Sequence, residues 1–131
     1  MTILATESQR FSNTVKQELW PEHSYCRNVV VINDAAATLK IGTVLGKVTA
    51  TGKYKVCSPG ASDGSQTTAA VLLQDITIAA TTDTNILAMT RGPAAVSFSG
   101  LQFGAGFTTD NQKAAARAQL EAVGVQVLDA V

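Results

Sequence analysis

The sequence predicts a mainly β domain that carries one short α-helix near its C-terminus and follows an N-terminal arm. Three observations support this fold class. From Asn28 onward, β-branched and apolar runs alternate with turn-forming residues, as in strands joined by turns. One alanine-rich segment has the spacing of a helix. Residues 1–27 show neither period, so we expect an extended N-terminal arm at 1–27 and a β-rich domain at 28–131.

The composition fits a single domain without a nucleic-acid partner. The chain has 131 residues, of which 46% are hydrophobic, so one packed core is within reach. Ten basic and ten acidic residues balance to a formal net charge of +0, whereas nucleic-acid binding favours an excess of positive charge. The longest uncharged run, 92–109, contains Pro93 and four glycines, so we expect no membrane span. No secretory signal is expected, and Cys26 and Cys57 are predicted to be reduced thiols.

Several strands are predicted between the arm and the helix, with a last one after it. They cover residues 28–32, 39–48, 51–57, 69–76, 84–92, 94–100 and 125–131. Gly42 and Gly46 interrupt the second strand and indicate a bulge or bend. In the third strand Tyr54 alternates with Lys53 and Lys55, which places the tyrosine and the lysines on opposite faces.

The segment 108–124 is predicted to be the helix. Thr109 is a suitable N-cap, and Gln112 follows three residues later, as in a capping box. Gly124 stands where a glycine commonly ends a helix. A narrow apolar stripe is predicted at Ala116, Leu120 and Val123. A single stripe indicates that the helix lies on a sheet.

Two glycine-containing segments could suggest a phosphate or cation site. The loop PGASDGSQ at 59–66 leads into a strand and offers only Asp63 as a charged ligand, whereas a phosphate cradle precedes a helix. We therefore interpret it as a connection between strands. The segment GAGF at 104–107 precedes the helix, but it lacks a third glycine and a βαβ unit.

The sequence offers little for catalysis or metal binding. His23 is the only histidine and lies in the arm, so a Ser or Cys triad would have to recruit it there. His23 and Cys26 form one H-x-x-C pair, which is short of the four ligands that zinc prefers. We predict no catalytic residues, no metal, no cofactor and no enzyme activity.

The apolar residues of the arm allow two interpretations. They could dock the arm on its own domain, or they could anchor it on a partner, where aromatic residues are favoured. We favour a division in which Trp20 and Tyr25 lie near the domain, whereas Ile3, Leu4 and Phe11 contact the partner.

Several segments together resemble the bacteriophage head decoration protein family (lambda gpD-like capsid cement proteins). The resemblance rests on GTVLGKVT (42–49), GKY (52–54), ASDGSQTTAAVLLQD (61–75), RGPAAV (91–96) and the short alanine-rich helix. It covers about residues 25–131. The most specific parts are the run from ASDGS to VLL and the RGPA segment.

The resemblance implies a clip-like, partly open β-barrel with one short C-terminal α-helix and an extended N-terminal arm. It also implies homotrimers at local threefold sites on the outer surface of an expanded phage head, where they bind the major capsid protein and stabilise the shell. The protein would assemble in the host cytoplasm and remain on the virion.

The resemblance further implies that the arm adds to the capsid protein as an extended segment. The predicted capsid contacts are Thr2, Ile3, Leu4, Ala5 and Phe11. The alternative is a small β-rich carrier or ligand-binding module. An exposed modifiable lysine in a hairpin turn, or a cluster of surface aromatic residues, would favour that alternative, and neither is evident in the sequence.

Overall fold

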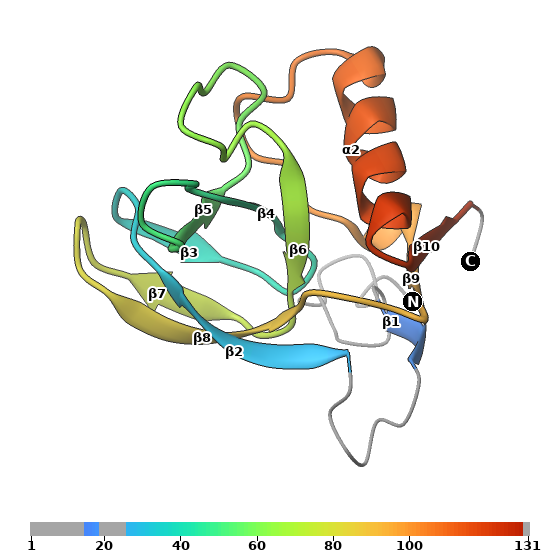
Figure 1. Cartoon of the computed structure of the whole chain (residues 1–131), viewed down its shortest axis with the longest axis horizontal. Helices are drawn as coiled ribbons and strands as arrows, with labels where there is room; N and C mark the ends of the chain where they lie inside the picture. The colour runs from blue at the N-terminus through green and yellow to red at the C-terminus, as the bar shows by residue number, and fades with distance from the viewer. Residues whose placement is uncertain (1–14, 19–25, 130–131) are drawn as a thin grey trace, which may run out of the picture.

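The computed structural model describes residues 15–18 and 26–129 of the chain (Figure 1). In these residues the chain forms ten β-strands, one 3-10 helix and one α-helix. In chain order they are β1 (Val15–Glu18), β2 (Arg27–Ile32), β3 (Ala37–Leu39), β4 (Val44–Lys47), β5 (Tyr54–Val56), β6 (Thr68–Leu72), β7 (Ile76–Ile78), β8 (Thr84–Met89), β9 (Ala94–Ser97), η3 (Phe98–Gly100), α2 (Asp110–Ala122) and β10 (Val125–Leu128).

Five strands form a closed barrel in the order β2-β5-β4-β6-β8. The join between β2 and β5 is a single residue pair, Ile32 with Tyr54, so the ring is nearly open there. A separate sheet has the order β1-β9-β10, in which β9 runs antiparallel to β1 and parallel to β10. The helix α2 lies against β10 and β6, as Figure 1 shows. The mainly β fold class and the single C-terminal helix are confirmed.

Two hydrophobic cores lie on opposite faces of the barrel strands. The inner core fills the barrel and includes Ile32, Leu45, Tyr54, Leu72 and Ile86. The outer core lies between the barrel and the layer of α2, β1, β9 and β10, and it includes Val15, Val44, Val71, Val96, Leu120 and Val125. Neighbouring residues such as Val71 and Leu72 therefore enter different cores, because side chains along a strand alternate between its faces. Burial on both faces explains the nearly continuous apolar runs of the sequence.

The predicted helix is confirmed at both ends. The hydroxyl of Thr109 accepts a hydrogen bond from the Gln112 amide, and the Gln112 side chain accepts one from the Thr109 amide at 3.1 Å. Gly124 has the positive φ of +91° that suits a glycine after a helix. Ala116 and Leu120 are buried, but Val123 is 38% exposed, because the helix ends at Ala122 and turns Val123 away from the core. The apolar stripe thus stops one turn earlier than predicted.

The strands predicted at 51–57, 84–92 and 125–131 are confirmed with shorter ends, and the strand predicted at 28–32 is confirmed with a start one residue earlier, at Arg27. The single strand predicted at 69–76 is wrong, because β6 ends at Leu72 and β7 begins at Ile76. At this break the Gln74 side chain accepts a hydrogen bond from the Leu87 amide at 2.7 Å, in place of a backbone partner.

Two further strand predictions need correction. The strand predicted at 39–48 is divided, since β3 ends at Leu39 and β4 begins at Val44, with Gly42 at φ +98° between them. The expected irregularity at Gly46 is present, where the register between β4 and β6 shifts. The strand predicted at 94–100 ends at Ser97 and continues as the 3-10 turn η3.

Candidate functional site

The predicted capsid contacts Thr2, Ile3, Leu4, Ala5 and Phe11 lie outside the described residues. The structure does show how the arm enters the domain. Strand β1 pairs with β9, where Val15 lies opposite Val96 and Glu18 opposite Ala94. The Val15 side chain is only 8% exposed and belongs to the outer core.

Residues 15–18 of the predicted arm are therefore part of a sheet of the domain. The boundary between arm and domain at 27 and 28 remains a prediction. Trp20, His23 and Tyr25 also lie outside the described residues, so the proposed division of the arm's apolar groups is not tested.

The beginning of β2 lies close to the end of β1. The Cys26 thiol donates to the Pro93 carbonyl at 3.4 Å, and the next residue, Ala94, pairs with Glu18 of β1. The RGPA segment that contains Pro93 is tightly packed. A Cβ atom at Gly92 would lie 1.8 Å from the Gly124 carbonyl oxygen, so only glycine fits there.

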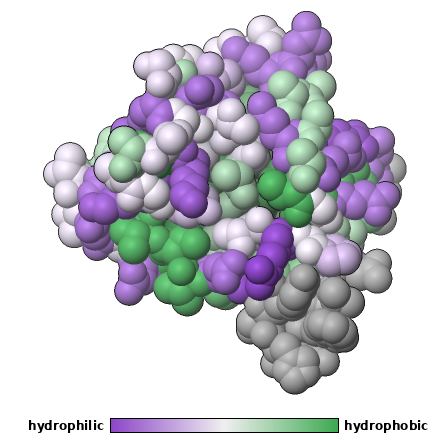
Figure 2. Space-filling view, viewed as in Figure 1, coloured by the Kyte–Doolittle hydropathy of each residue, from purple (hydrophilic) through white to green (hydrophobic). Residues whose placement is uncertain are grey.

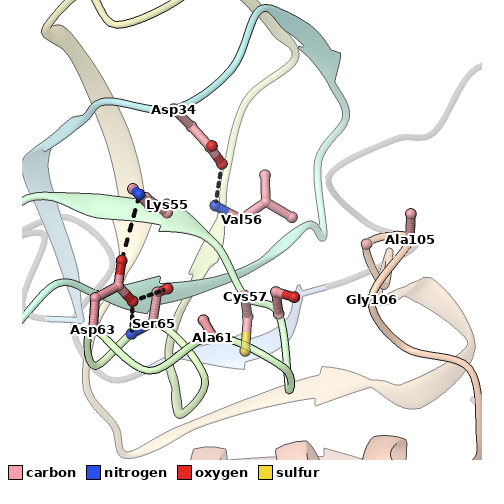
Figure 3. Close-up of a pocket in the computed structure, with 11 residues that line it drawn as sticks. Asp34, Lys55, Val56, Cys57, Ala61, Asp63, Ser65, Ala105 and Gly106 are labelled. Atoms are coloured by element: carbon pink, nitrogen blue, oxygen red, sulfur yellow. Dashed lines mark hydrogen bonds and ion pairs between the residues drawn. The ribbon is translucent and has the colours of Figure 1, made fainter.

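The loop 59–66 connects β5 to β6, as predicted, and its polar groups hold it in shape (Figure 3). One carboxylate oxygen of Asp63 accepts hydrogen bonds from the Ser65 hydroxyl at 2.6 Å and the Ser65 amide at 3.0 Å. The Lys55 ammonium donates to the other oxygen at 3.4 Å. These hydrogen bonds, with that from the Ser65 hydroxyl as the largest cause, lower the pKa of Asp63 to about 2. A Cβ at Gly46 would lie 2.2 Å from the Ser65 carbonyl oxygen, which shows how closely the loop covers β4.

A pocket of about 310 Å³ opens between this loop and the segment 104–106 (Figure 3). Its charged lining groups are already bonded. The two oxygens of Asp34 accept from the Ala35 amide at 2.7 Å and the Val56 amide at 3.0 Å, while Lys55 and Asp63 bond to each other. The carboxylate of Asp34 thus fixes the turn after β2 to strand β5.

The structure gives little support to a metal or thiol site within the described residues. No group of three or more His, Cys, Asp or Glu that could hold a metal occurs in residues 15–18 and 26–129. Both cysteines are buried and neither forms a disulfide, as predicted. Burial raises the pKa of the Cys57 thiol, which hydrogen-bonds with the Thr68 hydroxyl at 3.3 Å. None of the described helices has the length and apolarity needed to cross a bilayer.

Four lysines lie close together in the sequence, at positions 40, 47, 53 and 55, and three of them pair with carboxylates from other segments. Lys53 lies 3.0 Å from Asp83, Lys55 lies 3.4 Å from Asp63, and Lys40 lies 4.0 Å from Asp75. All six side chains are partly exposed, so each pair contributes little to stability. The pairing nevertheless means that these three lysines do not form a bare basic surface.

Three half-buried phenylalanines form a cluster between η3 and the helix. The ring centroids of Phe98 and Phe103 are 5.7 Å apart, and those of Phe103 and Phe107 are 4.9 Å apart. All three rings pack against the outer core. Lys113 and Arg117 of α2 lie over the rings of Phe103 and Phe98, at 5.5 and 5.7 Å from their centroids. The GAGF segment thus supplies one ring of a packing cluster.

The outer face of β2 is a feature that the sequence did not reveal. Val29 is 70% exposed, the highest value among the large apolar side chains of the described residues. It lies opposite the half-buried Leu87 of β8. An apolar run such as 28–32 is typical of a strand buried on both faces, so nothing in it distinguishes Val29 from its neighbours.

The comparison with protein families identifies the group to which this domain belongs. The family model of the bacteriophage lambda head decoration protein D matches residues 5–125. The chain belongs to this family. The comparison with curated proteins gives no match.

The family match confirms the resemblance and extends it into the arm. The matched range begins at Ala5 and includes Phe11, whereas Thr2, Ile3 and Leu4 precede it. It also includes β1, the closed barrel and α2. Membership of a phage head decoration family supports a structural role on the phage head and binding to the capsid.

Proposed function

We propose that this protein binds the outer surface of an expanded phage head as homotrimers at local threefold sites and stabilises the shell. The family match over residues 5–125 is the observation that carries this function. The described structure supports it through the fold, because a β-barrel with one C-terminal helix is what the resemblance to this family implied. The proposed partner is the major capsid protein, and no nucleic acid, membrane, cofactor or metal is proposed. The protein assembles in the host cytoplasm and remains on the virion.

Stabilisation follows from selective binding. A protein that binds the expanded shell but not its separated subunits shifts the equilibrium toward the intact shell. At a free concentration of 100 times the Kd, the shift is about 2.7 kcal/mol for each occupied site. Many sites on one head act together, so a modest affinity is enough.

The arm is the proposed means of attachment. Fourteen residues precede β1, and at about 3.3 Å per residue they reach roughly 46 Å when extended. An extended segment can pair its backbone with a sheet edge of the capsid protein while alternate side chains enter pockets. Thr2, Ile3, Leu4, Ala5 and Phe11 are the proposed contacts. Three arms on one trimer raise the avidity far above that of a single arm.

Binding to undecorated heads tests this function. Purified protein is added to expanded heads that lack a decoration protein, and the bound copies are counted as the concentration rises. We expect saturation at a multiple of three copies, trimers after cross-linking on the particles, and a higher temperature of head opening. Unexpanded heads serve as the control. Absence of binding to expanded heads would contradict the proposal, and dimers without trimers would contradict the trimeric state.

A further inference from the structure

The hydrogen bonds of β8 show which way the backbone of β2 points. Leu87 lies opposite Val29 in the antiparallel pair. The Leu87 amide donates to the Gln74 side chain at 2.7 Å, and the Leu87 carbonyl accepts from the Leu73 amide at 3.0 Å. The polar backbone groups of Leu87 thus point away from β2. In an antiparallel ladder this makes the pair with Val29 a non-hydrogen-bonded one, so the N–H and C=O of Val29 point to the other edge of β2.

That other edge is open around Val29. The neighbouring strand β5 pairs with β2 only at Ile32, the last residue of β2. Within the described residues, no backbone group is paired with Val29 on this edge. Its side chain is 70% exposed, and Val31 lies on the same face. In Figure 2 an apolar area covers the lower left of the view, where Figure 1 shows β2 and β8.

An open strand edge beside an apolar side chain is a site for strand addition. We propose that the edge of β2 at Val29–Val31 binds an extended, apolar segment of the capsid protein as an added strand. The N–H and C=O of Val29 and the N–H of Val31 pair with its backbone, and one of its apolar side chains packs on Val29 and Leu87. This inference rests on the proposed function, because it names a second contact with the same partner.

The position of the edge favours the capsid as its occupant. Cys26, three residues before Val29, contacts Pro93 beside the β9 residue that pairs with the end of β1. Three residues span about 10 Å, so the open edge begins close to the strand through which the arm enters the domain. An arm that binds the capsid would hold this edge near the same surface.

A second copy of this chain fits the edge less well. Two identical strands that pair antiparallel by the same edge are related by a twofold axis. Such pairing gives dimers and does not close a threefold ring. The edge of β2 paired with itself is therefore inconsistent with the trimer proposed above.

Two substitutions at one position test the proposal. Val29→Lys places a charge on the edge, which opposes strand addition, and the exposed side chain leaves the fold intact. Val29→Pro removes the N–H that faces the open edge without removing a bond to β8. The matched control is Val123→Lys, since Val123 is the other exposed large apolar side chain among the described residues.

Binding to undecorated expanded heads is measured for all variants, with the melting temperature of the free proteins. We expect both Val29 variants to bind about tenfold or more weakly, as for the loss of one buried valine, and Val123→Lys to bind within about twofold of the unmodified protein. If the unmodified protein binds and both Val29 variants bind equally well, the β2 edge is not a contact. That result would overturn this inference and leave the proposed function standing. Failure of the unmodified protein to bind would overturn the proposed function as well.

A photoreactive benzophenone side chain at position 29 identifies the occupant. After irradiation of decorated heads, mass spectrometry should find position 29 linked to a peptide of the capsid protein. Linkage to another copy of this chain, or to residues 1–14 of the same chain, would overturn the assignment to the capsid.

Discussion

The sequence pattern and the structure disagree about which apolar side chains of the helix pack on the sheet. Mutations in the helix can test this difference. Leu120 is fully buried in the outer core, whereas Val123 is 38% exposed beyond the end of α2. The periodicity of the sequence would place both side chains on the buried stripe. Replacing each by alanine therefore distinguishes the two arrangements.

From the structure we expect the two substitutions to lower the free energy of unfolding by different amounts. Removing a buried leucine side chain costs about 2–5 kcal/mol, because apolar contacts are lost and a cavity is left. For Val123→Ala, partial exposure reduces the expected cost to about 1 kcal/mol or less. A domain of this size has a total stability of about 7–20 kcal/mol, so both variants should still fold.

Thermal unfolding followed by circular dichroism measures the effect. At about 3–5 °C per kcal/mol, Leu120→Ala should lower the Tm by about 6–25 °C, and Val123→Ala by about 5 °C or less. Equal shifts, or a larger shift for Val123→Ala, would show that the helix packs with a different face and would refute the reasoning.

Three further predictions follow from the contacts described above. Gly92→Ala should destabilise the protein by about 1–3 kcal/mol or more in urea unfolding, because its Cβ would lie 1.8 Å from the Gly124 carbonyl oxygen; Gly60→Ala, with no atom within 4 Å of the added Cβ, is the control. The pKa of Asp63 is lowered to about 2 in the folded state. The contribution of its carboxylate to the stability of the fold is therefore present above the unfolded pKa of about 3.9 and is lost as the pH falls toward 2. Asp63→Asn should weaken the dependence of the Tm on pH between 5 and 2. Removing residues 1–14 should leave cooperative unfolding, because β1 and the buried Val15 remain, and should weaken head binding strongly; loss of cooperative unfolding would show that the arm completes the domain.

The parts of the fold that depend on residues close together in the sequence could be predicted from it. The helix is the clearest case, because Thr109, Gln112 and Gly124 define its ends within one segment of chain. The loop 59–66 was also predictable, since Asp63 and the glycines favour a turn whatever lies around them. Small residues that suit a turn do not depend on distant partners.

The missed strands depend on distant partners. The sequence VKQE of β1 has no apolar alternation, and it becomes a strand because Ala94–Val96 offers a partner edge. β3 and β7 are three residues each and pair only with each other. Segments this short carry no period of their own, so local patterns could not reveal them.

The predicted capsid contacts lie in residues 1–14, outside the described residues, so they stay a prediction. The open edge of β2 shows why the rest of the surface was also hidden from the sequence. Val29, Val30 and Val31 are identical side chains in a row, yet Val30 packs against the inner core while Val29 is 70% exposed. The difference arises because neighbouring side chains of β2 point to opposite faces of the barrel, and the outer face is left uncovered at Val29. A valine so exposed gains nothing for the free domain, whereas burial under an added strand would contribute about 1.5 kcal/mol or more. The residue is thus better suited to the bound state than to the isolated one.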